Sequence, residues 1–161
     1  MIVTVNTDAS FHHEYKVGAF AFWIVCNQGK IMHSGELKEA KDPTDAEIRC
    51  IANALHALLN SRFTGVTKVI INSDALHAFD RCGRSAQAGS PGRKVHNILQ
   101  SLKDRHSVSG RPIHEFRHVK AHSGTAEKRK WVNNWCDKAA KKMLWEKINR
   151  QNSDSSLISS P

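Results

Sequence analysis

The hydrophobic period of this chain changes near residue 40, and that change limits the folds it can form. Residues 2–8, 18–26 and 31–37 are largely apolar runs, and the last two are joined by Asn27-Gln28-Gly29-Lys30. Runs of this kind with short links predict a three-stranded antiparallel meander. From Ile48 to Leu59, apolar residues recur every three or four positions, which predicts a helix with one buried face.

The second half of the chain alternates strand and helix patterns. We expect a polar turn over residues 11–16, strands over 67–73 and 113–119, helices over 75–82, about 95–102 and 131–148, and a loop over 83–92. The order β-β-β-α-β-α-α-β-α predicts an α/β fold with a mixed five-stranded sheet, in which three antiparallel strands precede two helix-separated strands, flanked by helices. We expect one domain over residues 1–148 and a disordered tail, rich in Ser and Asn, over 149–161.

The formal net charge of +9 favours a polyanionic partner, with nucleic acid ahead of an anionic membrane. A merely soluble basic surface is the alternative. No apolar stretch of membrane-spanning length and no pattern typical of a signal peptide occur in the sequence. We therefore expect a protein that is not secreted, is cytoplasmic or nucleoid-associated, does not associate with membranes and is a monomer.

The four cysteines are widely separated and form no C-x-x-C pair; they are Cys26, Cys50, Cys82 and Cys136. This spacing predicts small core residues in a reducing compartment. Zinc binding by His118, His122 and Cys136 is a weaker alternative, because the two histidines fall in a strand and a loop and not on one helix face.

Four carboxylates lie where separate elements are expected to begin or end. Asp8 and Asp74 each close an apolar strand pattern, Glu47 opens the first helix, and Asp137 lies in the last helix. Carboxylate oxygens are the ligands that Mg²⁺ prefers. Two such ions held together stabilise the attacking and leaving oxygens of a phosphodiester. The set therefore predicts a metal-dependent nuclease.

Each carboxylate also has an ordinary structural interpretation. Thr44 and Glu47 match the S/T-x-x-E capping box, and Asp74 is placed to cap the following helix. Asp8 suits an Asx turn, and Asp137 suits an i,i+4 pair with Lys141. These alternatives stay open on the sequence alone. Trp131 and Trp135, four residues apart, are better explained as core residues of the last helix than as base-stacking platforms.

The phrases around these carboxylates resemble ribonuclease H of type 1. The resemblance covers residues 1–148 and rests on these segments: Thr7-Asp8-Ala9-Ser10, Glu47 in the first helical turn, Asn72-Ser73-Asp74, His118-Val119-Lys120-Ala121-His122-Ser123-Gly124, and Asn133-Asn134-Trp135-Cys136-Asp137. It implies a ribonuclease H-like fold and hydrolysis of the RNA strand of an RNA/DNA hybrid, with 5′-phosphate and 3′-hydroxyl ends.

The resemblance also implies roles for individual residues. Asp8 would bridge two Mg²⁺ or Mn²⁺ ions, Glu47 and Asp74 would complete one site, and Asp137 would contribute to the other. His122 would assist proton transfer or product release. The residues expected to contact nucleic acid are Ser10, Thr44, Arg84, Arg93, Lys94, Lys128, Arg129, Lys130 and Asn133.

Three departures from the family pattern bear on the substrate. Pro43-Thr44-Asp45 stands where many bacterial members have Asn-Asn-Arg, the asparagines of which read the minor groove of the hybrid. The Trp- and Lys-rich protrusion of those members is absent, and the segment between His122 and Asp137 is longer. Two alternatives therefore stay open: a nuclease of the same fold that cuts structured DNA or RNA, and a catalytically silent nucleic-acid-binding module.

Overall fold

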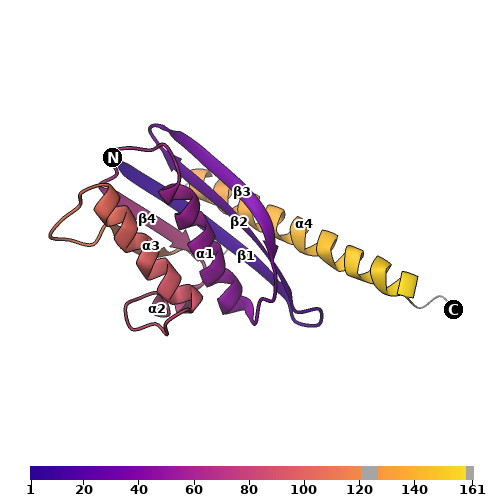
Figure 1. Ribbon diagram of the computed structural model, residues 1–161. Helices are drawn as coiled ribbons and strands as arrows, with labels where there is room; N and C mark the ends of the chain where they lie inside the picture. Colours follow the sequence, from indigo (N-terminus) through magenta and orange to yellow (C-terminus); the bar gives the residue numbers. More distant parts are fainter. Residues whose placement is uncertain (121–126, 159–161) are drawn as a thin grey trace.

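The computed structural model describes residues 1–120 and 127–158, with side chains over 132–156 in the second range. Within them lies a five-stranded sheet in the order β3-β2-β1-β4-β5 (Figure 1). The strands are β1 (Ile2–His12), β2 (Val17–Cys26), β3 (Gly29–Leu37), β4 (Lys68–Ser73) and β5 (His114–His118). The predicted α/β architecture is confirmed: β1, β2 and β3 form an antiparallel meander, and β4 and β5 extend it in parallel.

The helices cover both faces of the sheet. They are α1 (Pro43–Leu59), α2 (Leu76–Asp80), α3 (Pro91–Arg105) and α4 (Glu127–Ile158). Figure 1 shows α1 and α3 over one face and α4 across the other. The main core lies under α1 and α3, where Val3 and Val5 of β1 meet Leu55 and Leu102. Alternate burial along β1 follows from the two-residue period of a strand.

The face under α4 is formed by smaller side chains. Ala21 and Trp23 of β2 pack against Cys136 and Ala140 of α4. Trp135 contacts the Trp23 ring edge to face, with 5.9 Å between ring centroids, so the core interpretation of Trp135 is confirmed. The side chain of Trp131 lies outside the described residues. None of the helices in the described part of the chain is both long and apolar enough to span a membrane.

Two local predictions need correction. The turn expected over residues 11–16 is present over residues 13–16. Residues 11 and 12 belong instead to β1, because residues as far as His12 keep their antiparallel pairing with β2. Residues 149–158 were expected to be disordered, but they are the last part of α4. Arg150 binds Glu36 of β3, which holds this part of the helix to the sheet despite its polar composition. Residues 159–161 lie outside the described residues.

The four cysteines are free thiols; Cys50 and Cys136 are buried, as expected, whereas Cys26 and Cys82 are half-buried. Cys50 Sγ donates to the backbone oxygens of Asp8, at 3.3 Å, and Ala21, at 3.4 Å. The predicted core role therefore holds fully for Cys50 and Cys136. The thiol of Cys50 also joins α1 to the strand that carries Asp8.

Gly92 provides a test of how closely α3 approaches the preceding loop. A Cβ atom at Gly92 would lie 1.8 Å from the backbone oxygen of Arg81. Alanine ordinarily stabilises a helix by about 1 kcal/mol relative to glycine. Here the clash outweighs that gain, and we expect Gly92→Ala to lower the free energy of unfolding by about 1–3 kcal/mol. Gly83→Ala is the control, because a Cβ there meets nothing within 4 Å. Equal urea midpoints for the two variants would contradict this contact.

Candidate active site

Asp8 is positioned by a difference in length between neighbouring strands. The parallel pairing of β1 with β4 ends at Asn6 and Asn72, whereas β1 continues beside β2, with Asp8 opposite Ala21. Asp8 therefore lies within a strand and beyond the end of β4, and not at a strand end as expected. The Asx-turn interpretation is wrong, since the residue is part of the antiparallel ladder. Its half-buried side chain lies at the open notch beside β4.

Glu47 is directed into this notch from α1. The helix is capped by Asp42, whose Oδ1 accepts from the Asp45 amide at 2.7 Å, while Asp45 Oδ2 accepts from the Lys41 amide at 3.0 Å. These two bonds resemble a capping box, except that Asp45 accepts from the residue before the N-cap and not from the N-cap itself. The proposed Thr44–Glu47 capping box is therefore wrong, and Thr44 lies inside the first turn. Pro43 at the first helical position favours this start, because its missing amide hydrogen has no helical partner to lose.

The carboxylate of Glu47 is instead tied to the sheet. Glu47 is 7% exposed, and its Oε1 accepts from the Ala9 amide at 3.0 Å. Ser73 Oγ donates to Oε2 at 3.5 Å. These contacts hold the Glu47 side chain between β1 and β4. Its two partners are the sequence neighbours of the other carboxylates, because Ala9 follows Asp8 and Ser73 precedes Asp74.

Asp74 follows the last residue of β4 and is exposed. The N-cap of α2 is Ala75, without a side-chain cap bond, so the capping interpretation of Asp74 is wrong. Ser73 Oγ accepts the Ala75 amide at 3.2 Å and thereby supports the turn. His118 of β5 lies alongside, with its Nε2 at 3.1 Å from the backbone oxygen of Asp74.

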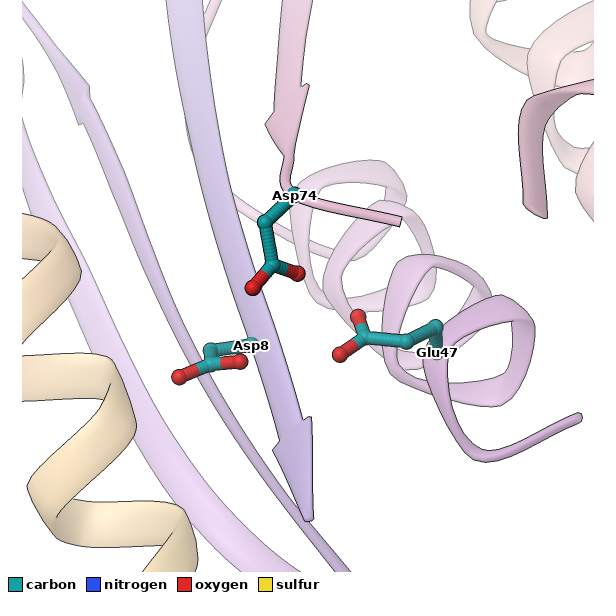
Figure 2. A group of neighbouring side chains, drawn as sticks. All are labelled: Asp8, Glu47 and Asp74. Carbon is teal, nitrogen blue, oxygen red and sulfur yellow. The ribbon is translucent and has the colours of Figure 1, made fainter. Parts of the chain in front are cut away.

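The three carboxylates converge on one point. Asp8, Glu47 and Asp74 each offer an oxygen, and these oxygens lie within 4.8 Å of one another. Figure 2 shows the Glu47 and Asp74 side chains directed toward Asp8 from different elements. Such a set of hard oxygen donors around a small space fits Mg²⁺ or Mn²⁺.

Electrostatics indicate that this arrangement is unfavourable without a cation. Burial, and then the charges of Asp74 and Asp137, raise the pKa of Asp8 to about 8. Burial, followed by the charges of Asp8 and Asp74, also raises the pKa of Glu47 well above its ordinary value. Like charges that are partly removed from water favour protonation, and a bound divalent cation reverses that preference. The carboxylates therefore fit a metal site better than a set of structural acids.

Asp137 of α4 lines the same cleft as Asp8 and Asp74. A cavity of about 110 Å³ is lined by Thr7, Asp8, Ser73, Asp74, Val119, Asn133, Asn134 and Asp137. Asp137 Oδ2 accepts from Lys141 Nζ at 2.9 Å, so the surface pair suggested by the sequence is also present. The two interpretations are compatible, because the carboxylate has a second oxygen. Among the described residues, Asp137 is not part of the compact cluster of three.

The residues expected to contact nucleic acid lie in different parts of the molecule. Ser10 is two residues beyond Asp8 on β1, Thr44 is half-buried in α1, and Asn133 lines the cleft. Arg93 Nη1 donates to the backbone oxygens of Arg84, at 2.8 Å, and Ala86, at 3.1 Å, so this guanidinium holds the loop before α3. Arg84 and Lys94 are exposed. His122 lies outside the described residues, as do the side chains of Lys128, Arg129 and Lys130.

Some supporting groups were missed in the sequence. The Ala9 amide and the Ser73 hydroxyl fix Glu47, but a backbone donor carries no sequence signal, and Ser73 was only part of a motif. His118 was considered as a zinc ligand, yet it contacts Asp74. The Cys136 thiol is buried under β1, with Sγ at 3.9 Å from the backbone oxygen of Asn6. No zinc cluster forms among the described residues.

A family comparison agrees with this geometry. The family model for RNase H matches residues 1–144. The chain belongs to the RNase H family. A crystal structure of RNase H1 from the halophilic archaeon Halobacterium salinarum NRC-1 superposes with a TM-score of 0.61 at 14% identity, and the match covers 91% of this chain and 99% of the archaeal chain. At this identity the similarity supports the ribonuclease H-like fold. No curated protein matches the chain.

The raised pKa of Asp8 predicts a pH-dependent stability in the absence of metal. The folded state holds the proton more tightly than the unfolded chain, whose reference pKa is 3.8, so the associated stability is present below about pH 4 and lost as the pH rises to about 8. In EDTA, we expect Asp8→Asn to stabilise the protein by about 1–3 kcal/mol at pH 8, a Tm increase of roughly 2–10 °C. Near pH 4 the difference should vanish.

Thermal unfolding at the two pH values checks this. Asp104→Asn, which changes an exposed carboxylate of α3, is the matched control. Adding Mg²⁺ at pH 8 should stabilise the wild type and have little effect on Asp8→Asn. An equal stability difference between wild type and Asp8→Asn at pH 4 and pH 8 would show that Asp8 does not titrate as described.

Proposed function

We propose that this RNase H family member is a metal-dependent endonuclease that hydrolyses the RNA strand of RNA/DNA hybrids. The observation that carries the proposal is the convergence of Asp8, Glu47 and Asp74 within 4.8 Å, at a cleft also lined by Asp137. A catalytically silent binding module would not need three acids held together at an electrostatic cost, two of them at least partly buried. Family membership supports the substrate class.

The proposed chemistry is phosphodiester hydrolysis. Water adds to the phosphorus, and the bond to the 3′ oxygen breaks, which leaves 5′-phosphate and 3′-hydroxyl ends. Asp8, Glu47 and Asp74 would hold one divalent ion, and Asp8 with Asp137 would hold a second. Bound there, the ions would supply charge neutralisation for the attacking and leaving oxygens. His122 would assist proton transfer or product release.

The contacts of this chain suggest how each ligand is kept in position. The Ala9 amide and the Ser73 hydroxyl fix both oxygens of Glu47. Lys141 holds one oxygen of Asp137, and Asp137 lines the cleft. Preorganisation of this kind limits the reorganisation needed when the substrate phosphate arrives.

The capping of α1 bears on substrate choice. Asp45 stands where many bacterial members of the family have the arginine of Asn-Asn-Arg, and an added acid near the substrate would repel phosphates. Its carboxylate is however turned away to accept the Lys41 amide, and Arg49 Nη1 lies 3.7 Å from Oδ2. The acid is therefore largely compensated, which supports a hybrid substrate despite the altered sequence. The half-buried Thr44 beside it supplies a hydroxyl for a minor-groove contact.

Cleavage assays test the enzymatic proposal. With Mg²⁺ or Mn²⁺, wild-type protein should cut the RNA strand of a hybrid, whereas Asp8→Asn and Asp74→Asn should lose about 10³-fold or more in rate, because a metal ligand becomes neutral. The control Asp104→Asn should keep wild-type activity. Hybrid, RNA duplex, DNA duplex and single strands are compared in parallel. Cleavage of a structured DNA or RNA instead of the hybrid would identify the alternative nuclease, and no cleavage at all would exclude the enzyme.

A second prediction concerns the basic start of α4. Replacing Lys128, Arg129 and Lys130 with alanine should weaken hybrid binding. The fall of the logarithm of the association constant with the logarithm of the salt concentration should become less steep by about 2–3, if each cation contacts one phosphate. Fluorescence anisotropy across a salt series measures both quantities. Replacing Arg62, Lys103 and Arg111, which lie at the end of α3 and in the segments that lead into β4 and β5, removes the same charge as a control. Equal slopes for the two variants would discard this role.

A further inference from the structure

A second concave surface lies beside the turn that joins β1 to β2. Its volume is about 640 Å³, and it extends between this turn, the segment after β3 and the second half of α4. We refer to it as the lysine groove, after four of its lining residues: Lys16, Lys38, Lys41 and Lys147. Tyr15 and Gln151 also line it. It shares no residue with the carboxylate cleft.

The part of α4 that follows the family match forms one wall of the groove. The family model ends at residue 144, whereas α4 continues to Ile158. Leu144 and Ile148 are buried against Val17 and Ala19 of β2. These apolar contacts hold the helix on the sheet far enough for Lys147 and Gln151 to reach the groove. One wall of the groove, with Lys147 and Gln151, therefore lies beyond the matched segment, and the rest lies within it.

Ion pairs on the neighbouring strand reinforce that wall. Glu36 of β3 lies 3.8 Å from Lys147 Nζ and also contacts the Arg150 guanidinium. One carboxylate is thus shared by two cations, so the acid next to the groove is neutralised. Glu39 is the one acid among the lining residues in the described part of the chain. The groove keeps a cationic excess from the exposed side chains of Lys16, Lys38 and Lys41.

The backbone around the groove is held in an uncommon conformation. Lys16 has a φ of 47° and Glu39 a φ of 55°, both in the left-handed region. Ser107 is the one other non-glycine residue with positive φ in the described chain. Left-handed backbone costs a non-glycine residue about 1–2 kcal/mol and gathers at functional sites. Two such residues line this groove, so its backbone is held in place at a local cost in stability.

We propose that the lysine groove binds the sugar–phosphate backbone of the duplex whose scissile phosphate lies in the carboxylate cleft. The inference rests on the proposed function for the identity of that duplex. From Asp8 to His12, where β1 ends just before the turn that lines the groove, β1 spans roughly 13 Å at about 3.3 Å per residue. A duplex that lies along β1 rises about 3.4 Å per base pair, so phosphates at least about four base pairs from the cleft would reach the groove. Lysines placed there neutralise phosphates without reading bases.

Length dependence of the substrate distinguishes this contact from the active site. A hybrid of about 6 base pairs, roughly 20 Å long, fills the cleft but gives the groove little backbone, whereas one of about 24 base pairs, roughly 80 Å long, reaches both. The test variant is Lys16→Asn/Lys38→Gln/Lys41→Gln. Asparagine is chosen at position 16 because it tolerates left-handed backbone. Lys147 is left intact because it pairs with Glu36.

Binding is measured by fluorescence anisotropy with the full chain carrying Asp8→Asn, so that the hybrid is not cut. The control variant is Arg62→Gln/Lys103→Gln/Arg111→Gln, which removes the same charge at the end of α3 and in the segments that lead into β4 and β5. For the long hybrid, we expect the groove variant to bind tenfold or more weakly at low salt and the salt slope to fall by about 2–3. For the short hybrid, affinity should change less than twofold.

Two results would overturn the proposal. Long-hybrid affinity and salt slope equal to those of the control variant would show that the groove contacts no phosphates. An equal loss on short and long hybrids would show that the lysines act on the carboxylate cleft through general charge. As a second variant, Lys38→Glu/Lys41→Glu should amplify the length-dependent loss. The binding result decides the proposal whether or not wild-type protein cleaves the hybrid, and cleavage assays judge the proposed function separately.

Discussion

The end of the pairing between β1 and β4 is the constraint on which the rest of the structure depends. Because β4 stops at Ser73 while β1 continues to His12 beside β2, the sheet has a notch at Asp8. Asp74 turns into the notch from the end of β4, and Glu47 enters from α1. If β4 continued for two more residues, its backbone would occupy this space, and the carboxylates could not share one ion.

The site is maintained against a local electrostatic cost. Burial and mutual repulsion favour protonation of Asp8 and Glu47, yet the surrounding donors favour their charged forms. The Ala9 amide does this for both residues, and Ser73 does so for Glu47. The strands that carry the acids are stabilised by the main core instead, in which Val3 and Val5 of β1 and Ile71 of β4 are fully buried. Such local conflict within an otherwise consistent core is typical of functional sites.

The sequence predicted the architecture well, because long apolar runs with a clear period leave few alternatives. It also identified Asp8, Glu47 and Asp74 as a set, since their flanking residues resemble a family. It failed where two local signals competed for one segment. The S/T-x-x-E phrase at Thr44 suggested a cap, but the helix starts earlier, because the Asp42 carboxylate accepts the Asp45 amide and Asp45 in turn accepts the Lys41 amide. Likewise, polar composition suggested disorder after residue 148, although tertiary contacts of α4 with β2 and β3 keep it helical.

The distribution of cations explains how a strongly basic chain can carry a strongly acidic site. Arg93, which the sequence assigned to phosphate contacts, holds a loop, and Lys141 neutralises one oxygen of Asp137. Neither side chain is then free to bind a phosphate, and a cation placed directly among the carboxylates would compete with a metal ion. In our proposal, the lysine groove attracts the polyanion at a distance, where its charges add affinity without disturbing the metal ligands. Helix α4 takes part in both regions, because Asp137 lines the carboxylate cleft and Lys147 lines the groove.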